Sequence, residues 1–373
     1  MNNKKQLIVC LDGLGYDQIS KGNTPFLYGL KQKSKLIELE TLYAWTGIEF
    51  SFFSGQMPEK HNIWFEFIRK DNSLFKYVKP FGIFGRKMAD YGAVAIQLLA
   101  GRTQLSKTYN IPFKLLDRFD TSATKNIWSL PFFKNKKYIC YKWPFFVENG
   151  RTKLIFRHES DKERLKRLID NLSDGIEIYY TQIVGLDKII HQFSQHHWQT
   201  INKLKEIDKL AKEYYGKFLE YFPQGEVYYW SDHSFSDIKN YLDIQSIMPK
   251  SKDYLAFYGG THISFWFDNK VIKNKIIKIL SSIKEGYILT EEDRINQHIP
   301  LDTKHGQLIF AIKPGNFICP NYYQKSKNDF VSMHGYDTRL FDKNGILASN
   351  KKIEKRKVAL NEAKRIIEEL SYS

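Results

Sequence analysis

The sequence predicts an α/β protein with a mostly parallel central sheet and inserted segments that cover the ends of its strands. Residues 6–11 form a continuous apolar run, which is typical of a strand that helices cover on both faces. Strand and helix signals alternate along much of the remaining chain, as a parallel sheet with crossover helices requires. Asp12, Asp187 and Asp232 each stand at or just beyond the end of a predicted strand. In open α/β sheets, that edge is where ligands bind.

The first part of the chain supplies two strands and two helices. In chain order, the predicted elements are a strand at 6–11, a helix at 25–33, a strand at 36–42 and a helix at 48–53. Thr24 and Pro25 mark the first helix, because threonine is a common N-cap and proline suits the first helical turn. The second helix begins just after Thr46 and Gly47. Residues 1–66 therefore open the α/β core.

The alternation breaks down between residues 67 and 150. This stretch is aromatic and basic, and it has neither helical nor strand periodicity. We therefore expect residues 67–150 to form a cap or insertion over the strand ends. The core would then consist of two segments, 1–66 and 151–373.

Regular alternation returns after residue 150. The predicted helices lie at 161–172, 200–221, 271–283 and 351–370, and the predicted strands at 176–183, 226–230, 254–258, 263–267, 287–289 and 308–312. Residues 254–294 are expected to form a second, small insertion, because they interrupt the core with their own strands and helix. Strand 308–312 would be the last strand of the core.

The charge of the chain allows several classes of partner. Its 373 residues include 57 Lys and Arg against 41 Asp and Glu, which gives a net charge of +16. This charge suits nucleic acid, an anionic membrane surface or a phosphorylated substrate, but also a surface that is simply solvated by lysine. The basic runs are scattered and no nucleic-acid motif accompanies them. The solvated surface is therefore favoured, and nucleic acid stays open as an alternative.

Hydropathy and cysteine content indicate the compartment. No apolar stretch reaches the roughly 18–20 residues of a membrane-spanning helix, and the apolar run near the N-terminus is too short for a signal peptide. The three cysteines are far apart, which does not suggest a disulfide framework. We therefore expect a cytoplasmic protein without a membrane span.

Carboxylates and imidazoles recur in an order that suits a metal centre. Asp187 and His191 are four residues apart, so one helical turn would put them on the same face. Asp232 is followed directly by His233, and His334 arrives on a late loop. Mixed carboxylate and imidazole ligands suit zinc, manganese or iron rather than calcium. Each motif alone is also explained as a turn, a helix cap or a surface pair, so their joint occurrence carries the prediction.

Five short motifs occur in order along the chain. They are Leu11-Asp12-Gly13, the threonine before Ser54-Gly55-Gln56-Met57-Pro58-Glu59-Lys60-His61, the pair Asp187 and His191, Ser231-Asp232-His233, and Met333-His334-Gly335-Tyr336-Asp337. Together they resemble the type I phosphodiesterase/nucleotide pyrophosphatase family of the alkaline phosphatase superfamily, over residues 6–337. The resemblance implies an alkaline-phosphatase-like three-layer core. It also identifies 254–294 as the small βαβ-type insertion of such enzymes.

The resemblance further implies a ligand set and a mechanism. Asp12, Thr46, Asp232 and His233 would surround one divalent ion, and Asp187, His191 and His334 would surround a second. Zinc is the expected metal, with manganese or iron as alternatives. Thr46 would be the nucleophile of a phosphoester hydrolase that works through a phosphothreonine. The substrate would be a small phosphodiester or pyrophosphate, such as a nucleotide or nucleotide-sugar derivative.

The sequence departs from the family pattern at two positions. Thr46 lies one residue closer to Gly55 than the usual nucleophile, which leaves Thr41 as a second candidate. Glu66 stands approximately where the diesterases have an asparagine that holds a phosphate oxygen. A carboxylate there would repel phosphate unless it is protonated or paired with a cation. The choice between a phosphodiesterase and a phosphomonoesterase therefore stays open.

Two further residues are candidate substrate contacts. Gly47 opens a predicted helix, whose free backbone N–H groups and positive end suit a phosphoryl group. His262 follows two glycines in the second insertion and is a candidate contact from that side. An alternative of a different class is a non-catalytic binding or assembly protein that uses its basic surface. The oligomeric state is not indicated.

Overall fold

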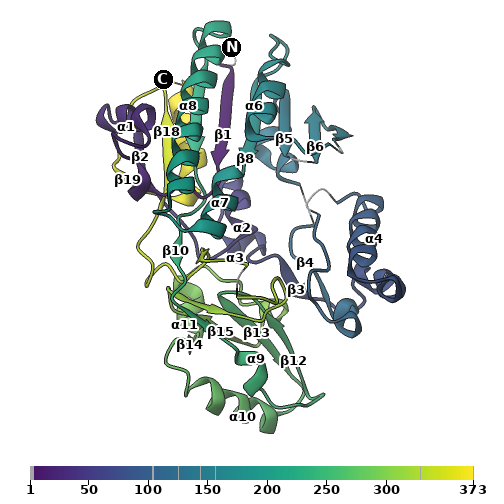
Figure 1. The fold of residues 1–373 in the computed structure, drawn as a ribbon. Helices are drawn as coiled ribbons and strands as arrows, with labels where there is room; N and C mark the ends of the chain where they lie inside the picture. The colour runs from purple at the N-terminus through teal and green to yellow at the C-terminus, as the bar shows by residue number, and fades with distance from the viewer. Residues whose placement is uncertain are drawn as a thin grey trace.

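The centre of the molecule is a nine-stranded sheet in the order β19-β2-β18-β9-β1-β8-β5-β6-β7 (Figure 1). The computed structural model describes residues 4–372, apart from 103–104, 125, 143, 156 and 328. The strands are β1 (Gln6–Leu11), β2 (Leu36–Glu40), β5 (Tyr138–Lys142), β6 (Phe145–Glu148), β7 (Arg151–Leu154), β8 (Ile178–Ile183), β9 (Glu226–Trp230), β18 (Gly345–Ser349) and β19 (Lys357–Ala359). β1 pairs in parallel with β8 and β9, and β5 with β8. The predicted mostly parallel α/β class is confirmed.

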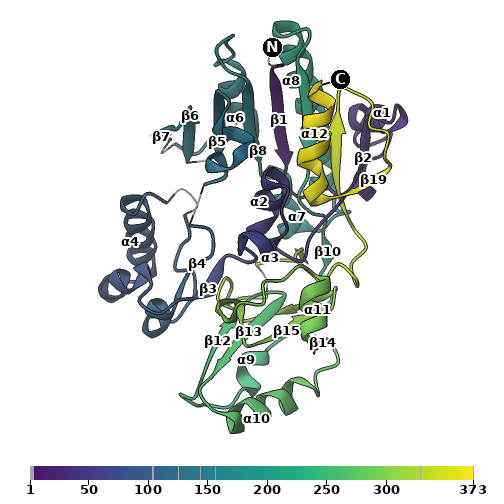
Figure 2. The same ribbon diagram turned by 180° about the vertical axis from the view of Figure 1, so that it is seen from behind.

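Helices cover the sheet on both faces and make a three-layer core. They are α1 (Pro25–Gln32), α2 (Gly47–Ser54), α6 (Asp161–Ile169), α7 (Gly185–Phe193), α8 (Trp198–Tyr221) and α12 (Ala363–Tyr372). Every residue of β1 is buried. Leu7 and Val9 belong to an apolar cluster with α1, α6 and α8, whereas Ile8 and Cys10 belong to one with α2 and α12. Figures 1 and 2 show these two sets of helices on opposite faces.

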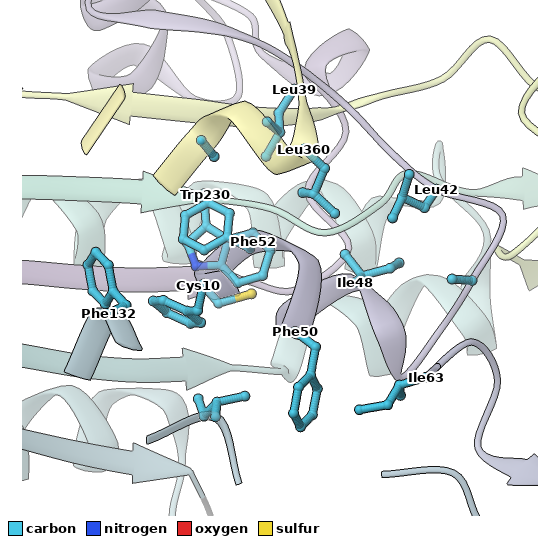
Figure 3. Close-up of a cluster of buried hydrophobic side chains, with 14 of the residues drawn as sticks. Cys10, Leu39, Leu42, Ile48, Phe50, Phe52, Ile63, Phe132, Trp230 and Leu360 are labelled. Carbon is cyan, nitrogen blue, oxygen red and sulfur yellow. The ribbon is translucent and has the colours of Figure 1, made fainter. Parts of the chain in front are cut away.

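The aromatic packing around α2 fixes the point where the nucleophile candidate lies. Figure 3 shows part of this cluster, in which Phe52 stacks on Trp230 of β9 with ring centroids 3.9 Å apart. Phe53 packs edge-on against Tyr180 of β8, at 4.9 Å between centroids. Because α2 begins directly after Thr46, these contacts fix the helix that follows this residue against β8 and β9.

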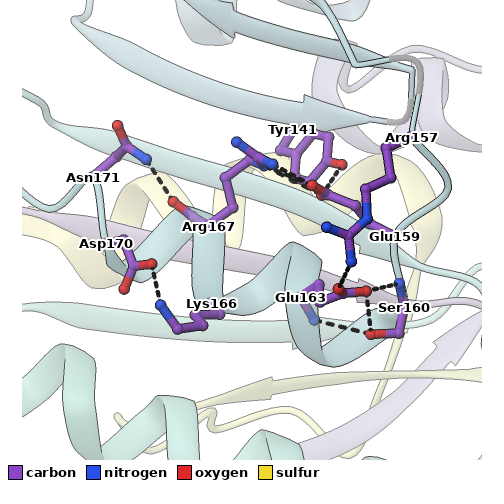
Figure 4. A network of polar contacts seen from close by, with 9 residues as sticks. All are labelled: Tyr141, Arg157, Glu159, Ser160, Glu163, Lys166, Arg167, Asp170 and Asn171. Carbon is purple, nitrogen blue, oxygen red and sulfur yellow. Dashed lines mark hydrogen bonds and ion pairs between the residues drawn. The ribbon is translucent and has the colours of Figure 1, made fainter.

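On the other face, polar contacts join α6 to the sheet (Figure 4). Ser160 caps α6 by accepting a hydrogen bond of 3.3 Å from the Glu163 N–H, and the Glu163 carboxylate accepts one of 2.8 Å from the Ser160 N–H. Glu159 accepts a hydrogen bond from the hydroxyl of Tyr141 in β5 and pairs with Arg167 of α6. This network anchors β5 against its covering helix.

The sheet takes in strands that the sequence pattern does not predict. The predicted cap, 67–150, contains β5 and β6, which pair with each other while β5 also pairs with β8. The helix predicted at 351–370 was wrong in its first half, because residues 357–359 form β19, which pairs with β2. β18 has no predicted counterpart, and it lies between β2 and β9, antiparallel to both.

A second sheet lies below the central one in both views (Figures 1 and 2). It is antiparallel, in the order β12-β13-β15-β14. Its elements are β12 (Tyr254–Tyr258), β13 (His262–Phe267), α10 (Lys270–Leu280), β14 (Gly286–Ile288), α11 (Glu291–Asn296) and β15 (Leu308–Ile312). β13, α10 and β14 form a βαβ unit whose strands flank β15. Residues 308–312 therefore belong to this sheet and not, as predicted, to the core. The prediction was wrong because a buried strand of five residues has the same apolar pattern in either sheet.

The segment between residues 67 and 121 packs on this second sheet. It contains β3 (Phe67–Arg69), a 3₁₀ segment η2 (Leu74–Phe84), α4 (Arg86–Leu99), a 3₁₀ segment η3 (Phe113–Arg118) and β4 (Phe119–Thr121). Phe67 and Phe119 both contact Phe257 of β12, at 5.3 and 5.2 Å between ring centroids. This segment therefore shares one apolar cluster with the second sheet. Within the described chain, no helix combines the length and apolarity that crossing a membrane requires.

Candidate metal centre and active site

Three carboxylates converge at one edge of the central sheet. Asp12 directly follows β1, Asp232 comes two residues after β9, and Asp187 lies in the first turn of α7, which follows β8. Because β1 runs parallel to both β8 and β9, the three chain segments leave the sheet at the same edge. The convergence predicted from strand ends is thus what the structure has.

The three histidines reach this edge by different routes. His191 lies one turn after Asp187 on α7, with its Nε2 3.5 Å from Asp187 Oδ1. His233 follows Asp232 in the chain. His334 is brought in by strand β17 (Ser332–Met333), which pairs with β10 (Ser236–Asp237). As a result, the rings of His233 and His334 stack with their centroids 3.6 Å apart.

The donor atoms form two adjoining groups that share His233. Its Nε2 lies 3.4 Å from Asp12 Oδ1, 3.5 Å from Asp232 Oδ2 and 3.8 Å from Asp187 Oδ1. Asp187 Oδ1 is also 3.7 Å from His334 Nε2. Two donors that each lie about 2 Å from a tetrahedral ion are roughly 3.3 Å apart, so these separations suit shared metals better than direct hydrogen bonds. Within each of the two groups, all donor atoms lie within 4.8 Å of one another.

The electrostatics of the centre call for cations. Burial raises the pKa of Asp187 and of Asp232 to about 7, and the neighbouring carboxylates add to the rise. Burial and Asp187 hold the pKa of Asp12 well above its ordinary value. Burial lowers the pKa of His191 to about 3, so its imidazole is neutral and keeps a free lone pair. Crowded buried carboxylates beside neutral imidazoles are the donor set that a divalent metal stabilises.

Further contacts orient these donors. Gln182, near the end of β8, donates a 2.7 Å hydrogen bond to Asp12 Oδ2, and the Gly13 N–H donates one of 3.2 Å to Asp232 Oδ1. His191 Nδ1 donates to the carbonyl of Ser332 at 2.8 Å, which leaves Nε2 facing the centre. Gln182 is not among the residues that the sequence predicts for the site. Its signal is the polar pair Thr181-Gln182 near the end of a buried strand.

Thr46 stands at the start of α2 with its side chain partly exposed. Among the described residues, neither its hydroxyl nor its N–H has a hydrogen-bond partner. Thr41, the second candidate, is buried, and its hydroxyl donates a 2.7 Å hydrogen bond to the carbonyl of Asp232. The free hydroxyl is therefore that of Thr46.

Gly47 has a different role from the one predicted. Its N–H donates to the carbonyl of Trp64 at 3.2 Å, so this donor is not free for a phosphoryl group. A Cβ at this position would lie 2.2 Å from the carbonyl oxygen of Ile63. Glycine is required here because two backbone segments touch.

A cavity of about 280 Å³ adjoins His191 and His334 of the centre. Its lining includes His191, His334, Trp45, Glu66, Tyr109, Tyr323 and Phe330. Trp45 lies 5.2 Å from Tyr323, and Tyr323 lies 5.1 Å from Tyr109, measured between ring centroids. The cavity is thus largely aromatic, with one carboxylate in its wall.

Glu66 is held inside this cavity by hydroxyl groups. Its Oε1 accepts a 3.1 Å hydrogen bond from the Tyr109 hydroxyl. Burial raises its pKa to about 7, against the lowering effect of hydrogen bonds from neighbouring hydroxyls. His262, the other predicted substrate contact, lies outside the lining residues. It is buried and packs against Phe65, at 4.0 Å between ring centroids.

Comparisons with known proteins agree with this fold. The family model for type I phosphodiesterase / nucleotide pyrophosphatase matches residues 6–337. No curated protein sequence matches the chain. Human ectonucleotide pyrophosphatase / phosphodiesterase 5 has a similar structure, with a TM-score of 0.68, 13% identity and coverage of 99% of this chain and 95% of that one.

Two murine structures of ectonucleotide pyrophosphatase / phosphodiesterase 5 are similar as well. Each covers 99% of this chain and 95% of its own at 12% identity, with TM-scores of 0.67 and 0.66. The second is an inactive threonine-to-alanine form in complex with AMP. At this identity the likeness shows the fold, which is the alkaline-phosphatase-like fold expected from the motifs. On the family match over residues 6–337, the chain belongs to the type I phosphodiesterase / nucleotide pyrophosphatase family.

Proposed function

We propose that the protein is a two-metal-dependent phosphodiesterase or pyrophosphatase that works through a phosphothreonine at Thr46. Its family makes it a hydrolase of phosphoester bonds. The observation that carries the finer proposal is the meeting of three carboxylates and three imidazoles. A threonine with a free hydroxyl accompanies them, and its chain neighbour Trp45 lies 5.7 Å from His334 between ring centroids. No other described group of His, Cys, Asp and Glu residues gathers in this way.

Two ligand groups would hold the ions. As the family resemblance implies, Asp12, Asp232, His233 and Thr46 would hold one, and Asp187, His191 and His334 the other. The His233 Nε2 also lies 3.8 Å from Asp187 Oδ1 and so adjoins the second group. Zinc suits this oxygen and nitrogen donor set, with manganese or iron as alternatives. When bound, the ions would supply Lewis-acid stabilisation of the attacking and leaving oxygens of an in-line displacement.

The protein's own groups would then carry out the rest of the reaction. The Thr46 hydroxyl loses its proton and attacks phosphorus, the P–O bond to the leaving group breaks, and the leaving oxygen takes up a proton from water. The resulting phosphothreonine still carries the other organic group of the substrate. Water later cleaves this ester and releases the second product. The unpartnered N–H of Thr46 and the N-terminal end of α2 can hold the phosphoryl oxygens. Gly47 does not contribute its N–H, because Trp64 occupies it.

The cavity supports a small organic phosphate as substrate. Its aromatic wall, with Trp45, Tyr109 and Tyr323, suits a planar group stacked beside the metal centre. A similar murine structure holds AMP. We therefore propose a nucleotide or nucleotide-sugar derivative. The three cysteines are free and buried, which supports a reducing compartment such as the cytoplasm.

The test compares esters and metals in one assay. The protein is stripped with a chelator, reloaded with zinc, manganese or iron, and assayed on bis-p-nitrophenyl and mono-p-nitrophenyl phosphate. We expect turnover only after reloading, with the diester as the better substrate. Asp232→Asn should lose turnover and bound metal together. Preference for the monoester would make the protein a phosphomonoesterase, and absence of metal-dependent turnover on both esters would contradict the proposal.

A further inference from the structure

Exposed apolar side chains gather on one protruding part of the molecule. Ile83, Phe84 and Leu99 are 85%, 75% and 89% exposed, and Tyr91 and Met88 are also exposed. These five residues, here named the α4 surface, lie on α4 and at the end of the 3₁₀ segment η2 before it. Single exposed apolar residues are ordinary, but a contiguous group marks an interaction site.

The helix itself is apolar on two sides. Met88, Tyr91 and Leu99 recur at intervals of three or four residues, as does the exposed Ala95 between them, so they share one face. The opposite face carries the buried Ala89, Ala93 and Gln97. A helix that only packed against its own domain would present polar side chains to water. The outer face of α4 therefore has the composition of a face that meets another apolar phase.

The position of α4 leaves this face accessible. Figures 1 and 2 both show α4 at the rim of the molecule, apart from the central sheet. Its inner face is occupied, because Asp90 accepts a 2.8 Å hydrogen bond from the Thr108 N–H and Gln97 donates one of 2.7 Å to the Ser106 carbonyl. The loop so held continues to Tyr109 in the cavity wall. The outer face makes none of these contacts.

The surroundings of the α4 surface are strongly basic. Between residues 69 and 118 the chain has ten Lys and Arg against three Asp and no Glu, a net charge of +7 out of +16 for the whole protein. Each of the three acidic groups already has a partner. Asp71 pairs with Arg118 at 3.2 Å, and Asp117 pairs with Lys79 at 2.6 Å. Asp90 accepts the hydrogen bond from Thr108. Two of the ten cations, Lys70 and Arg102, pair with the buried Asp120 just beyond this range. The remaining excess includes Arg86 and Lys87, which lie on α4 itself together with the exposed apolar residues.

We propose that the α4 surface docks on the surface of an anionic lipid bilayer. Apolar side chains that enter the boundary between headgroups and acyl chains, combined with lysines that attract anionic headgroups, match both features of this region. Nucleic acid would use the charge but leave Phe84 and Leu99 in water. A second copy of the chain would bring two positive surfaces together. This proposal does not depend on the substrate or the metals of the active site.

The experiment measures co-sedimentation of the full chain with lipid vesicles. Vesicles of phosphatidylcholine alone are compared with vesicles that also contain phosphatidylglycerol, at low and at high salt. We expect binding to the anionic vesicles, at least roughly tenfold weaker without the anionic lipid and weaker again at high salt. Ile83→Ser/Phe84→Ser and Leu99→Ser should each weaken binding by roughly tenfold or more, because each removes apolar area that enters the bilayer.

A matched control variant distinguishes an effect of the α4 surface from the effect of removing any exposed apolar side chain. Val271 on α10 is 80% exposed, so Val271→Ser removes a similar side chain from another part of the molecule. It should leave vesicle binding unchanged, and all variants should keep wild-type turnover. Equal binding to neutral and anionic vesicles, or an equal effect of Val271→Ser, would overturn the proposal. So would salt-sensitive binding to an oligonucleotide that the apolar variants leave intact, or a dimer that forms through this surface without vesicle binding.

Discussion

Two threonines differ in whether the side-chain hydroxyl is free to react. Thr41 and Thr46 lie five residues apart, and the sequence offers both as nucleophiles. The hydroxyl of Thr41 donates a hydrogen bond to the carbonyl of Asp232, whereas that of Thr46 has no partner among the described residues. Thr41 therefore supports the segment that carries Asp232 and His233. The nucleophile assignment to Thr46 stays a prediction.

Removal of the Thr46 hydroxyl should separate catalysis from assembly. We expect Thr46→Ala to keep the fold and both metals, because six other donors remain, while turnover falls by roughly three orders of magnitude or more. Thr46→Ser should retain part of the rate. The measurement is turnover together with metal content. Thr41→Ala is the comparison, and it should lower metal content and turnover together because it releases the Asp232 carbonyl. Near-normal turnover in Thr46→Ala would show that another group is the nucleophile.

Glu66 should make stability depend on pH. Its pKa in the folded protein is raised to about 7, so its contribution is intact below its ordinary pKa and is lost as the pH rises through 7. Glu66→Gln stays neutral and should therefore exceed the wild type in unfolding free energy by roughly 1–3 kcal/mol at about pH 8.5, but not at about pH 4.5. Urea unfolding with bound metal measures this difference.

The control for this comparison is Glu220→Gln, which changes an exposed carboxylate on α8. It should shift the unfolding free energy equally at both pH values. If Glu66→Gln behaved in the same way, Glu66 would be a solvated carboxylate and not a buried one.

At the scale of elements, strand ends were predictable and strand partners were not. Asp12 and Asp232 follow buried strands that the sequence predicts, so their meeting could be predicted from a parallel sheet alone. His334 is different, because only the pairing of β17 with β10 brings it to His233. That pairing spans two residues on each strand, which is too short to leave a pattern in the sequence.

The same limit explains the errors in the fold. β19 is three residues long and charged at its start, so the surrounding lysines and glutamates suggested one long helix. β5 and β6 are aromatic, as a cap would be, yet they lie in the central sheet. Burial by tertiary neighbours decided these segments, and local periodicity does not record it.

The approach of α2 to the segment after α3 (Pro58–His61) depends on a missing side chain. In Gly47→Ala, the new Cβ would lie 2.2 Å from the Ile63 carbonyl oxygen, so the backbone must shift. We expect this variant to lose roughly 2 kcal/mol or more of stability and to displace Thr46, which also lowers turnover. Gly29→Ala is the control, because nothing lies within 4 Å of its Cβ in helix α1. That variant should gain about 0.5–1 kcal/mol. Equal effects on unfolding would contradict the close contact.

At the scale of the whole molecule, the metal centre joins segments from both ends of the chain. Asp12 and His334 are more than three hundred residues apart in sequence. Bound ions would therefore act as cross-links, and a chelator should lower the melting temperature by several degrees. Without ions, Asp12, Asp187 and Asp232 repel one another.

Asp187→Asn should consequently have opposite effects in the two states. With a chelator present at about pH 8, we expect it to melt roughly 2–5 °C above the wild type, because one repelling charge is gone. With excess zinc it should melt below the wild type, because a ligand is missing. Scanning calorimetry in both buffers measures the crossover. A variant that melts below the wild type in both buffers would show that Asp187 stabilises the fold independently of metal binding.

The place of β18 in the sheet also determines the order in which the strands can pair during synthesis. β1, β8 and β9 can pair in the order in which they leave the ribosome, but β2 must wait, because both of its neighbours, β18 and β19, are made last. His334 is translated only shortly before β18. A nascent chain that has not released residues 334–349 thus has an incomplete set of donors and an open sheet. We therefore expect catalytic activity only after the ribosome has released residues 334–349 and β18 has paired with β9.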